Sequence, residues 1–463
     1  MKDIFLAVVA FSTVAAFATP VEVDWKAGET MPAKVARPFG GFLPDGTFLV
    51  AGGSDFKDGK KVYGADISVR AQDGTWKKVG ELPRAIAEGV SCETPNGIFC
   101  AGGTDGKEKF SGAFLLAAEN GASRVSSLPS LPEPVSMGAA AADGAKVYVV
   151  ASKNVYVMDE GGKWQLVAEV PGPAREQHVA AIQNGDQKEK MLVVYGGFDV
   201  ATKATLHDGY GLVLSQIGAN GTSGTTKTDG TDCQWKKLSP LPENTTTIGA
   251  AFLPSGHQHV LLVGGFGEKG WLERAVKGST EADPVKLGWQ RKVLAYNCVT
   301  DAWCEYGEIA PGDRPRCGAA AGIRPGKTPE QYTILLAGGE VAPKVRTDAV
   351  SVASFRKTGK FGATAWAVVG VYALLMVAMA VYFIRKKKDE NDYFRGGNRI
   401  PWYVAGMSIF ATMLSSITFI AIPTQAYLQD WRYFVMAFFI IGMAPVAIYY
   451  YLPFFCRLGI TSA

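Results

Sequence analysis

The chain has 463 residues, which is more than one ordinary domain needs. It contains 54 glycines and only 19% charged residues, and this composition favours many short strands joined by turns. The net charge of +4 comes without a basic stripe, so the sequence gives no indication of a nucleic-acid partner.

The first predicted element is an export signal over residues 1–18. One lysine precedes a long apolar run that ends in Ala16-Phe17-Ala18, a pattern typical of a secretory signal peptide and its cleavage site. An uncleaved membrane anchor fits the same residues. In either case we expect the residues from 19 onward to be exported.

Residues 19–357 contain a repeat with the period of kelch proteins. Apolar runs that end in a glycine pair recur about every 46–50 residues where no insertion intervenes, and a degenerate copy lies near residue 151. Tryptophans follow most of the pairs at the place expected in such a repeat. The pairs are Gly52-Gly53, Gly102-Gly103, Gly196-Gly197, Gly264-Gly265 and Gly338-Gly339, and the tryptophans are Trp76, Trp164, Trp235 and Trp303. We therefore predict an all-β propeller of six four-stranded blades.

The last repeat lacks a closing strand with its tryptophan. The segment around Trp25 looks like the final strand of a blade that has nothing before it. Pairing this segment with the blade at 331–355 would close the ring and leave no open edge. The Gly/Thr-rich residues 217–232 are predicted to form a flexible surface loop.

Two pairs of cysteines are spaced to face one another across predicted hairpins. Cys92 with Cys100, and Cys298 with Cys304, could form disulfides in an exported domain, or each could be an isolated buried thiol. The four histidines and seven cysteines show no spacing of a zinc site.

Three apolar segments near the C-terminus are predicted to cross a lipid bilayer. Residues 364–384 carry no charge and precede four basic residues, so they should span the membrane and place the linker 385–400 in the cytoplasm. Further spans are predicted at about 402–427 and 433–455. The middle span holds a cluster of small hydroxyl residues, which fits either close helix packing or a broken helix that coordinates a cation. Its members include Thr412, Ser415, Ser416 and Thr418.

The stretch DYFRGGNRIPW, residues 392–402, closely resembles a motif of sodium:solute symporters, and the resemblance covers about 389–463. It implies the inverted-repeat symporter fold, with residues 401–463 as the first two of ten core helices. The transporter would then be truncated here, and its other helices would belong to a longer chain or to a partner chain. The resemblance also implies half of a sodium site and two polar substrate contacts. These are the backbone carbonyls of Ala411 and Leu414, and the side chains of Ser415 and Thr418.

The stretch GEVAPKVRTDAV, residues 339–350, resembles the catalytic segment of the kelch-type N-acetylneuraminate epimerases, which are sialic acid mutarotases. The resemblance covers about 22–355, and the late position of this blade resembles a cyclically permuted branch of the family. It implies Glu340 as general acid/base, Arg346 as the anchor of the substrate carboxylate, and no cofactor. From the two residues alone, an inert Glu–Arg ion pair in a loop is the favoured interpretation, because exposed pairs of this kind are common.

Four more arginines stand ahead of glycine pairs, at Arg37, Arg84, Arg175 and Arg316. Inner strands of a propeller line its channel, so these arginines are candidates to bind an acidic sugar. They also fit a structural role in each repeat. Arg175 is the candidate to test first.

The combined prediction is a sialic acid mutarotase in the bacterial periplasm, attached through the inner membrane to a sodium-coupled sialic acid transporter. The alternative is a non-catalytic sugar-binding propeller that captures or senses glycans for the transporter. Copper chemistry of the galactose-oxidase type is disfavoured, because the chain has only four histidines.

Overall fold

The computed structural model describes residues 21–119, 121–158, 161–185, 189–217, 235–271, 286, 288–309, 313–326, 331–357, 363–386, 400–413, 422, 438–439 and 442–458. They divide into two compact units, Met1–Thr358 and Gly359–Ala463. The predicted signal peptide at 1–18 and residues 218–232 of the predicted loop lie outside the described residues.

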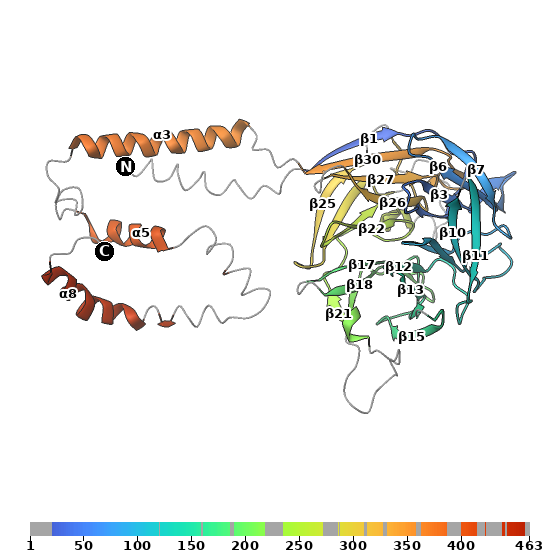
Figure 1. Ribbon diagram of the computed structural model, residues 1–463, viewed down its shortest axis with the longest axis horizontal. Helices are drawn as coiled ribbons and strands as arrows, with labels where there is room; N and C mark the ends of the chain where they lie inside the picture. Colours follow the sequence, from blue (N-terminus) through green and yellow to red (C-terminus); the bar gives the residue numbers. More distant parts are fainter. Residues whose placement is uncertain are drawn as a thin grey trace, which may run out of the picture. The chain divides into compact units, whose positions relative to one another are not determined.

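The first unit is a six-bladed β-propeller, as the repeat predicts (Figure 1). Each blade is an antiparallel sheet of four strands. Blade I contains β2 (Phe39–Phe42), β3 (Phe48–Ala51), β6 (Asp66–Arg70) and β7 (Trp76–Glu81); blade II contains β8 (Val90–Thr94), β9 (Gly97–Ala101), β10 (Ala113–Glu119) and β11 (Ala122–Leu128); blade III contains β12 (Ala139–Asp143), β13 (Lys146–Ala151), β14 (Asn154–Met158) and β15 (Trp164–Glu169).

The other three blades follow the same pattern, and the last of them takes its outer strand from the N-terminal segment. Blade IV contains β17 (Val179–Asn184), β18 (Lys190–Tyr195), β20 (Gly209–Val213) and β21 (Lys236–Leu238); blade V contains β22 (Ala251–Ser255), β23 (His259–Val263), β24 (Lys292–Asn297) and β25 (Ala302–Glu308); blade VI contains β26 (Ala320–Pro325), β27 (Gln331–Ala337), β30 (Val350–Lys357) and β1 (Val21–Ala27).

Short elements decorate the connections within blades. Two are hairpins: β4 (Ser54–Lys57) with β5 (Lys60–Tyr63), and β28 (Glu340–Ala342) with β29 (Val345–Arg346). A third two-stranded sheet pairs β16 (Arg175–Glu176), just before blade IV, with β19 (Phe198–Asp199) inside that blade. A helical turn, α2 (Glu268–Trp271), and a 3-10 turn, η1 (Leu214–Gln216), complete the described elements of this unit.

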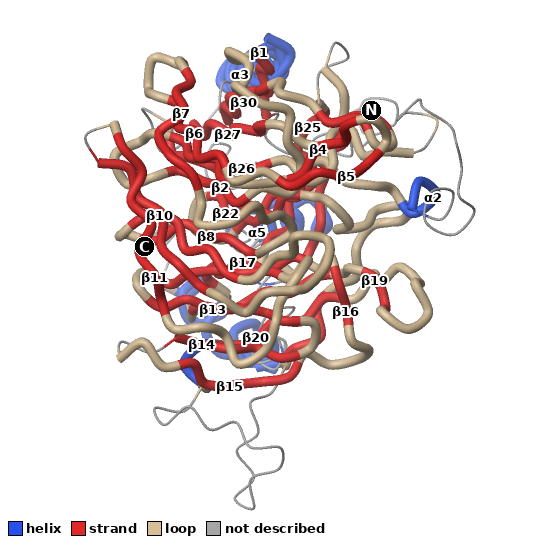
Figure 2. Tube along the Cα trace, turned by 90° about the vertical axis from the view of Figure 1, so that its right-hand side faces the viewer, coloured by secondary structure: helices blue, strands red, loops and turns tan. Residues whose placement is uncertain are grey.

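The inner strands form a closed ring (Figure 2). This ring surrounds a central channel. Each inner strand contacts the inner strands of the blades before and after it, and β26 contacts β2. The channel wall consists largely of glycine and alanine, which leave it open along part of its length.

Strand β1 completes blade VI by pairing antiparallel with β30, in a register that runs from Val21 opposite Lys357 to Ala27 opposite Ser351. This is the pairing that the unpaired tryptophan strand led us to expect. The indole of Trp25 also donates to the carbonyl of Glu308 at 2.8 Å, which ties blade VI to blade V. Trp76 and Trp164 make the same kind of bond to the preceding blade, to Glu29 and Pro129.

The glycine pairs end the second strand of their blades in the left-handed backbone conformation. Gly52 and Gly53 have φ of 66° and 101°, and a Cβ on Gly52 would lie 2.5 Å from the carbonyl oxygen of Ile86. Only glycine enters this turn without strain. In the degenerate copy Ser152 adopts the same conformation, with φ of 55°.

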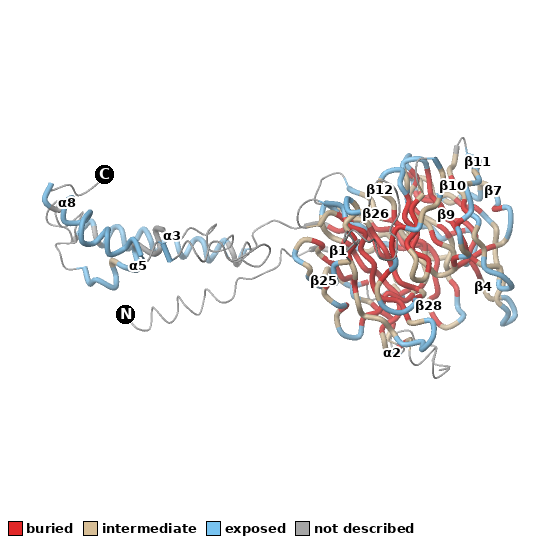
Figure 3. Tube along the Cα trace, turned by 90° about the horizontal axis from the view of Figure 1, so that it is seen from below, coloured by how far each residue is buried: buried red, intermediate tan, exposed pale blue. Residues whose placement is uncertain are grey.

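The core of the propeller lies between the blades (Figure 3). Six buried clusters each combine side chains from two neighbouring blades, including one between blades VI and I. Burial of this apolar surface is the main favourable term in folding, so each blade is stabilised by both of its neighbours.

Cys92, Cys100, Cys298, Cys304 and Cys317 are free thiols. Cys92 lies opposite Phe99, so Cys100 points to the other face of the sheet. Cys304 lies opposite Ala295, too far along the ladder from Cys298. The disulfide alternative is therefore wrong for both predicted pairs.

The second unit contains helices. They are α3 (Ala363–Lys386), α5 (Trp402–Met413), a π-helical turn η4 (Ala447–Tyr451) and α8 (Leu452–Arg457). None of the helices in the described residues combines the length and the apolarity of a membrane span. The spans predicted from sequence are thus not confirmed.

A buried histidine makes the propeller sensitive to acid. Burial, with the nearby charge of Arg175, lowers the pKa of His178 to about 4 from 6.5. The unfolded chain therefore binds a proton that the folded chain rejects, and stability falls as pH drops from about 6.5 to 4, by roughly 3 kcal/mol in total. Urea unfolding at pH 7, 5.5 and 4 should show this loss, and it should shrink in His178→Gln. An equal loss in both chains would contradict the assignment.

Candidate functional site

A ring of six residues surrounds the channel on the face where the inner strands begin. Each lies just before an inner strand, and each has a positive φ between 52° and 69°. They are Arg37, Glu88, Met137, Gln177, Gly249 and Gly318, in the order of blades I to VI. This conformation favours glycine, so the four side chains in the ring are held there against backbone strain.

Backbone hydrogen bonds link the members of this ring. Arg37 N donates to the Gly318 carbonyl at 2.7 Å, and Glu88 N donates to the Arg37 carbonyl at 3.0 Å. Similar bonds join Met137 to Glu88 and Gln177 to Met137. The backbone around the channel mouth is thereby fixed, and the side chains it carries have defined directions.

A pocket of about 310 Å³ opens beside this ring. Its size falls within the range of small-molecule sites, roughly 300–1,000 Å³. The lining combines charged, amide and aromatic side chains from blades that are distant in sequence: Arg37, Phe56, Lys61, Gln177, Phe266, Trp271, Cys317, Glu340 and Arg346.

Glu340 and Arg346 face each other across the β28–β29 hairpin. Their side chains form an ion pair and are only 9% and 6% exposed. The Cys317 backbone bonds Glu340 in both directions, N to O at 3.0 Å and O to N at 2.9 Å, which fixes the hairpin to the start of blade VI. The Lys344 amide donates to Glu340 Oε1 at 3.2 Å. The Arg346 guanidinium lies 5.1 Å from the centre of the Phe56 ring.

Two more cations belong to the same pocket. Arg37 donates from Nη2 to the Gln177 Oε1, and these residues precede blades I and IV, on opposite sides of the ring. Lys61 forms an ion pair with Glu88. The described lining thus holds three cations and one carboxylate, a balance that suits an anionic ligand.

An aromatic wall closes another side of the pocket. Trp271 stacks on Phe198 with ring centres 4.8 Å apart, packs on the edge of Phe266, and donates from its indole to the Lys203 carbonyl at 3.1 Å. Such a fixed apolar surface beside charged groups is typical of sugar sites, where one face of the ring is apolar.

Arg175, by contrast, is fully buried within its own blade. It binds Asp208 with two parallel hydrogen bonds, of 3.0 Å and 3.1 Å, and donates to the Pro171 carbonyl at 2.9 Å. It does not line the pocket. These contacts indicate a structural role, in which Arg175 holds the segment before blade IV against the segment that contains Asp208.

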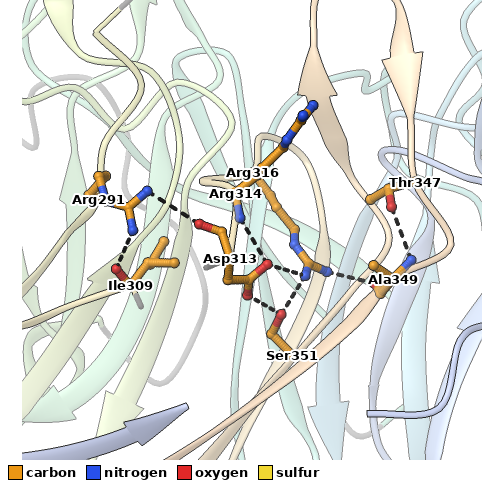
Figure 4. Close-up of polar contacts among 8 residues, drawn as sticks. All are labelled: Arg291, Ile309, Asp313, Arg314, Arg316, Thr347, Ala349 and Ser351. Atoms are coloured by element: carbon orange, nitrogen blue, oxygen red, sulfur yellow. Dashed lines mark hydrogen bonds and ion pairs between the residues drawn. The ribbon is translucent and has the colours of Figure 1, made fainter. Parts of the chain in front are cut away.

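Arg316 has an equivalent environment in blade VI (Figure 4). It is 4% exposed and donates to the Ala349 carbonyl at 2.6 Å and to Asp313 at 3.0 Å. The Ser351 hydroxyl accepts a hydrogen bond from Arg316 and donates one to Asp313. Arg84 is exposed and lies 4.5 Å from the centre of the Phe110 ring, in a different surface pocket.

Of the site residues expected from sequence, the structure brings Glu340, Arg346 and Arg37 together. Ala411 lies in α5, whereas Leu414, Ser415 and Thr418 lie outside the described residues. Sequence reasoning missed Phe56, Lys61, Gln177 and Trp271. Gln177 could have been found as the blade IV counterpart of Arg37, because both precede the inner strand at the same distance.

Comparison with known proteins gives two separate regions of similarity. No protein-family model matches the chain. The N-acetylneuraminate epimerase of Pasteurella multocida is 26% identical over 270 residues, which cover 53% of this chain and 63% of the relative. The sodium/sialic acid symporter SiaT of Proteus mirabilis is 47% identical over 103 residues, which cover 22% of this chain and 21% of the relative.

A solved structure of the protein YjhT superposes with a TM-score of 0.48 at 14% identity, covering 69% of this chain and 94% of that one. The chain spans less than two thirds of the epimerase and about a fifth of the symporter. It therefore has homologues named epimerase over half its length, and a sialic acid symporter match in its C-terminal part.

Proposed function

We propose that the propeller is a sialic acid mutarotase, which interconverts the anomers of N-acetylneuraminate or a related acidic sugar. The observation that carries this proposal is the pocket beside the channel mouth, where a buried carboxylate and three cations meet an aromatic wall. The epimerase relatives support the substrate class. The position of Glu340 in the last blade supports a cyclically permuted order of the blades.

The reaction needs a group that moves a proton between two oxygens. Removal of the anomeric hydroxyl proton and protonation of the ring oxygen break the bond from the ring oxygen to the anomeric carbon, giving the open keto form. Closure on the other face of the keto group reverses these steps, so no atom is gained or lost. In our proposal Glu340 is the general acid/base, and its ion pair with Arg346 holds it as the carboxylate that takes up the first proton.

The direct test is an NMR time course that starts from α-N-acetylneuraminate with the full chain in detergent micelles. We expect the anomers to interconvert well above the rate in buffer. A chain that binds the sugar but leaves the buffer rate unchanged would support the alternative of a non-catalytic capture propeller and would rule out the mutarotase.

For the C-terminal unit we propose a part of a sodium-coupled sialic acid transporter, with the propeller in the bacterial periplasm and the C-terminal segments in the inner membrane. The similarity to SiaT and the apolar composition support this proposal. Ala411 and Leu414 would hold the sodium ion through backbone carbonyls, and Ser415 and Thr418 would contact the substrate. The oxygen chemistry of such carbonyls suits a hard cation. The mutarotase would then supply the anomer that the transporter takes up.

A further inference from the structure

We propose that Arg37 binds the carboxylate of the substrate, and that Arg346 instead positions Glu340. This inference rests on the proposed mutarotase function and assigns the two arginines of the pocket to different tasks. The sequence placed the carboxylate anchor at Arg346, and the contacts of the two side chains favour the other assignment.

Arg346 is already engaged by a carboxylate of the protein. It stands directly opposite Glu340 in the hairpin, both side chains are less than 10% exposed, and the Phe56 ring packs on the guanidinium. Transfer of Arg346 to a substrate carboxylate would leave Glu340 buried without its ionic partner, which is costly at such a site. An arginine held in this way fixes the position of the acid/base group.

One partner of Arg37 is a neutral amide, which a substrate can replace at lower cost than a carboxylate. Its guanidinium donates to the side-chain oxygen of Gln177, a neutral amide from the opposite side of the ring. Exchanging an amide oxygen for a carboxylate oxygen converts a neutral acceptor into a charged one, and charge-assisted hydrogen bonds of arginine are stronger. At this contact an acid is therefore favoured over the amide of Gln177.

The backbone places Arg37 next to Glu340. Arg37 N bonds the carbonyl of Gly318, and the adjacent Cys317 bonds Glu340 in both directions. A Cβ on Gly318 would lie 2.7 Å from the Arg37 Cγ, so the glycine makes room for this side chain. In sialic acid the carboxylate sits on the anomeric carbon itself. The anchor and the acid/base must then be neighbours, as Arg37 and Glu340 are.

The test compares N-acetylneuraminate with its methyl ester, which keeps the anomeric centre but lacks the negative charge. In Arg37→Met we expect kcat/KM for the acid to fall roughly 10–100-fold, the range of a lost charge-assisted contact, while the ester changes little. In Arg346→Met both compounds should slow together, because the shared acid/base is disturbed. Met137 occupies the same ring conformation in blade III, so methionine is tolerated there. Arg84→Met is the matched control away from the pocket.

A second variant tests the same contact from the other side. Gln177→Glu places a carboxylate within reach of Arg37, and it should weaken binding of the acid at neutral pH by a similar factor while the ester binds as before. The inference is overturned if the preference for the acid survives Arg37→Met and disappears in Arg346→Met. Unchanged affinity for the acid in Gln177→Glu would also overturn it. If wild type accelerates neither compound, the proposed function fails, and the dissociation constants of acid and ester in the same variants still decide the anchor.

Discussion

Glu340→Gln is expected to slow anomer exchange by roughly 10²–10⁴-fold, the usual contribution of a general acid/base. Glutamine has nearly the same shape but cannot take up a proton at neutral pH. The rate of α-to-β conversion, measured by NMR at saturating N-acetylneuraminate, reports the loss directly. Glu305→Gln is the control, because Glu305 forms an exposed ion pair with Lys292 on blade V, outside the pocket.

The variant also leaves Arg346 beside a neutral amide, so a loss of folding has to be separated from a loss of chemistry. Urea unfolding of both variants provides that separation. The double variant Glu340→Gln with Arg346→Met removes the buried charge and should recover stability without recovering rate. If Glu340→Gln exchanges anomers at the wild-type rate, Glu340 is not the general acid/base. The ion pair with Arg346 then serves only to stabilise the hairpin.

Arg175→Met is expected to destabilise the propeller by about 3 kcal/mol or more, because it leaves Asp208 facing a site built for a guanidinium. Arg175 is fully buried and Asp208 is 22% exposed, which places the effect at the lower end of the range for broken buried pairs. The free energy of unfolding in urea measures it. KM for the sugar should stay near the wild-type value, since Arg175 does not line the pocket.

The double variant Arg175→Met with Asp208→Leu tests the assignment to a structural pair. Removing both partners takes away the buried charge as well as its acceptor, so the double variant should be more stable than Arg175→Met alone. If Arg175→Met instead raises KM strongly and leaves stability unchanged, the structural assignment is wrong. Arg175 would then contact the substrate, as the sequence suggested.

The blades could be predicted from the sequence because each is a local pattern. The glycine pairs end a strand in a conformation that few other residues adopt, and a tryptophan lies at or next to the start of the outer strand in four of the blades. The place of strand β1 was predictable for a different reason. The segment around Trp25 had no blade of its own, and the last repeat lacked its outer strand. In a closed ring these two ends of the propeller sequence meet. Glu340 and Arg346 were found because they share one short segment.

The rest of the pocket could not be predicted because it joins connections from different blades. Phe56 and Lys61 belong to the hairpin of blade I, and Trp271 follows a glycine pair in blade V. The prediction that Arg175 and Arg316 line the channel did not match their positions, for a geometric reason. Arg175 and Arg316 each stand two residues before the ring position, where a side chain turns into its own blade, whereas Arg37 occupies the ring position itself.

The pairing of β1 with β30 allows two chains to exchange their β1 strands if they meet while folding. The two strands lie near opposite ends of the propeller sequence, so blade VI closes late, and until then the outer edge of β30 presents unpaired amides and carbonyls. That edge can form the same hydrogen bonds with the β1 strand of another molecule as with its own, and the foreign strand competes only when molecules are concentrated. Refolding at high concentration should therefore yield domain-swapped dimers, and refolding at high dilution should yield monomers.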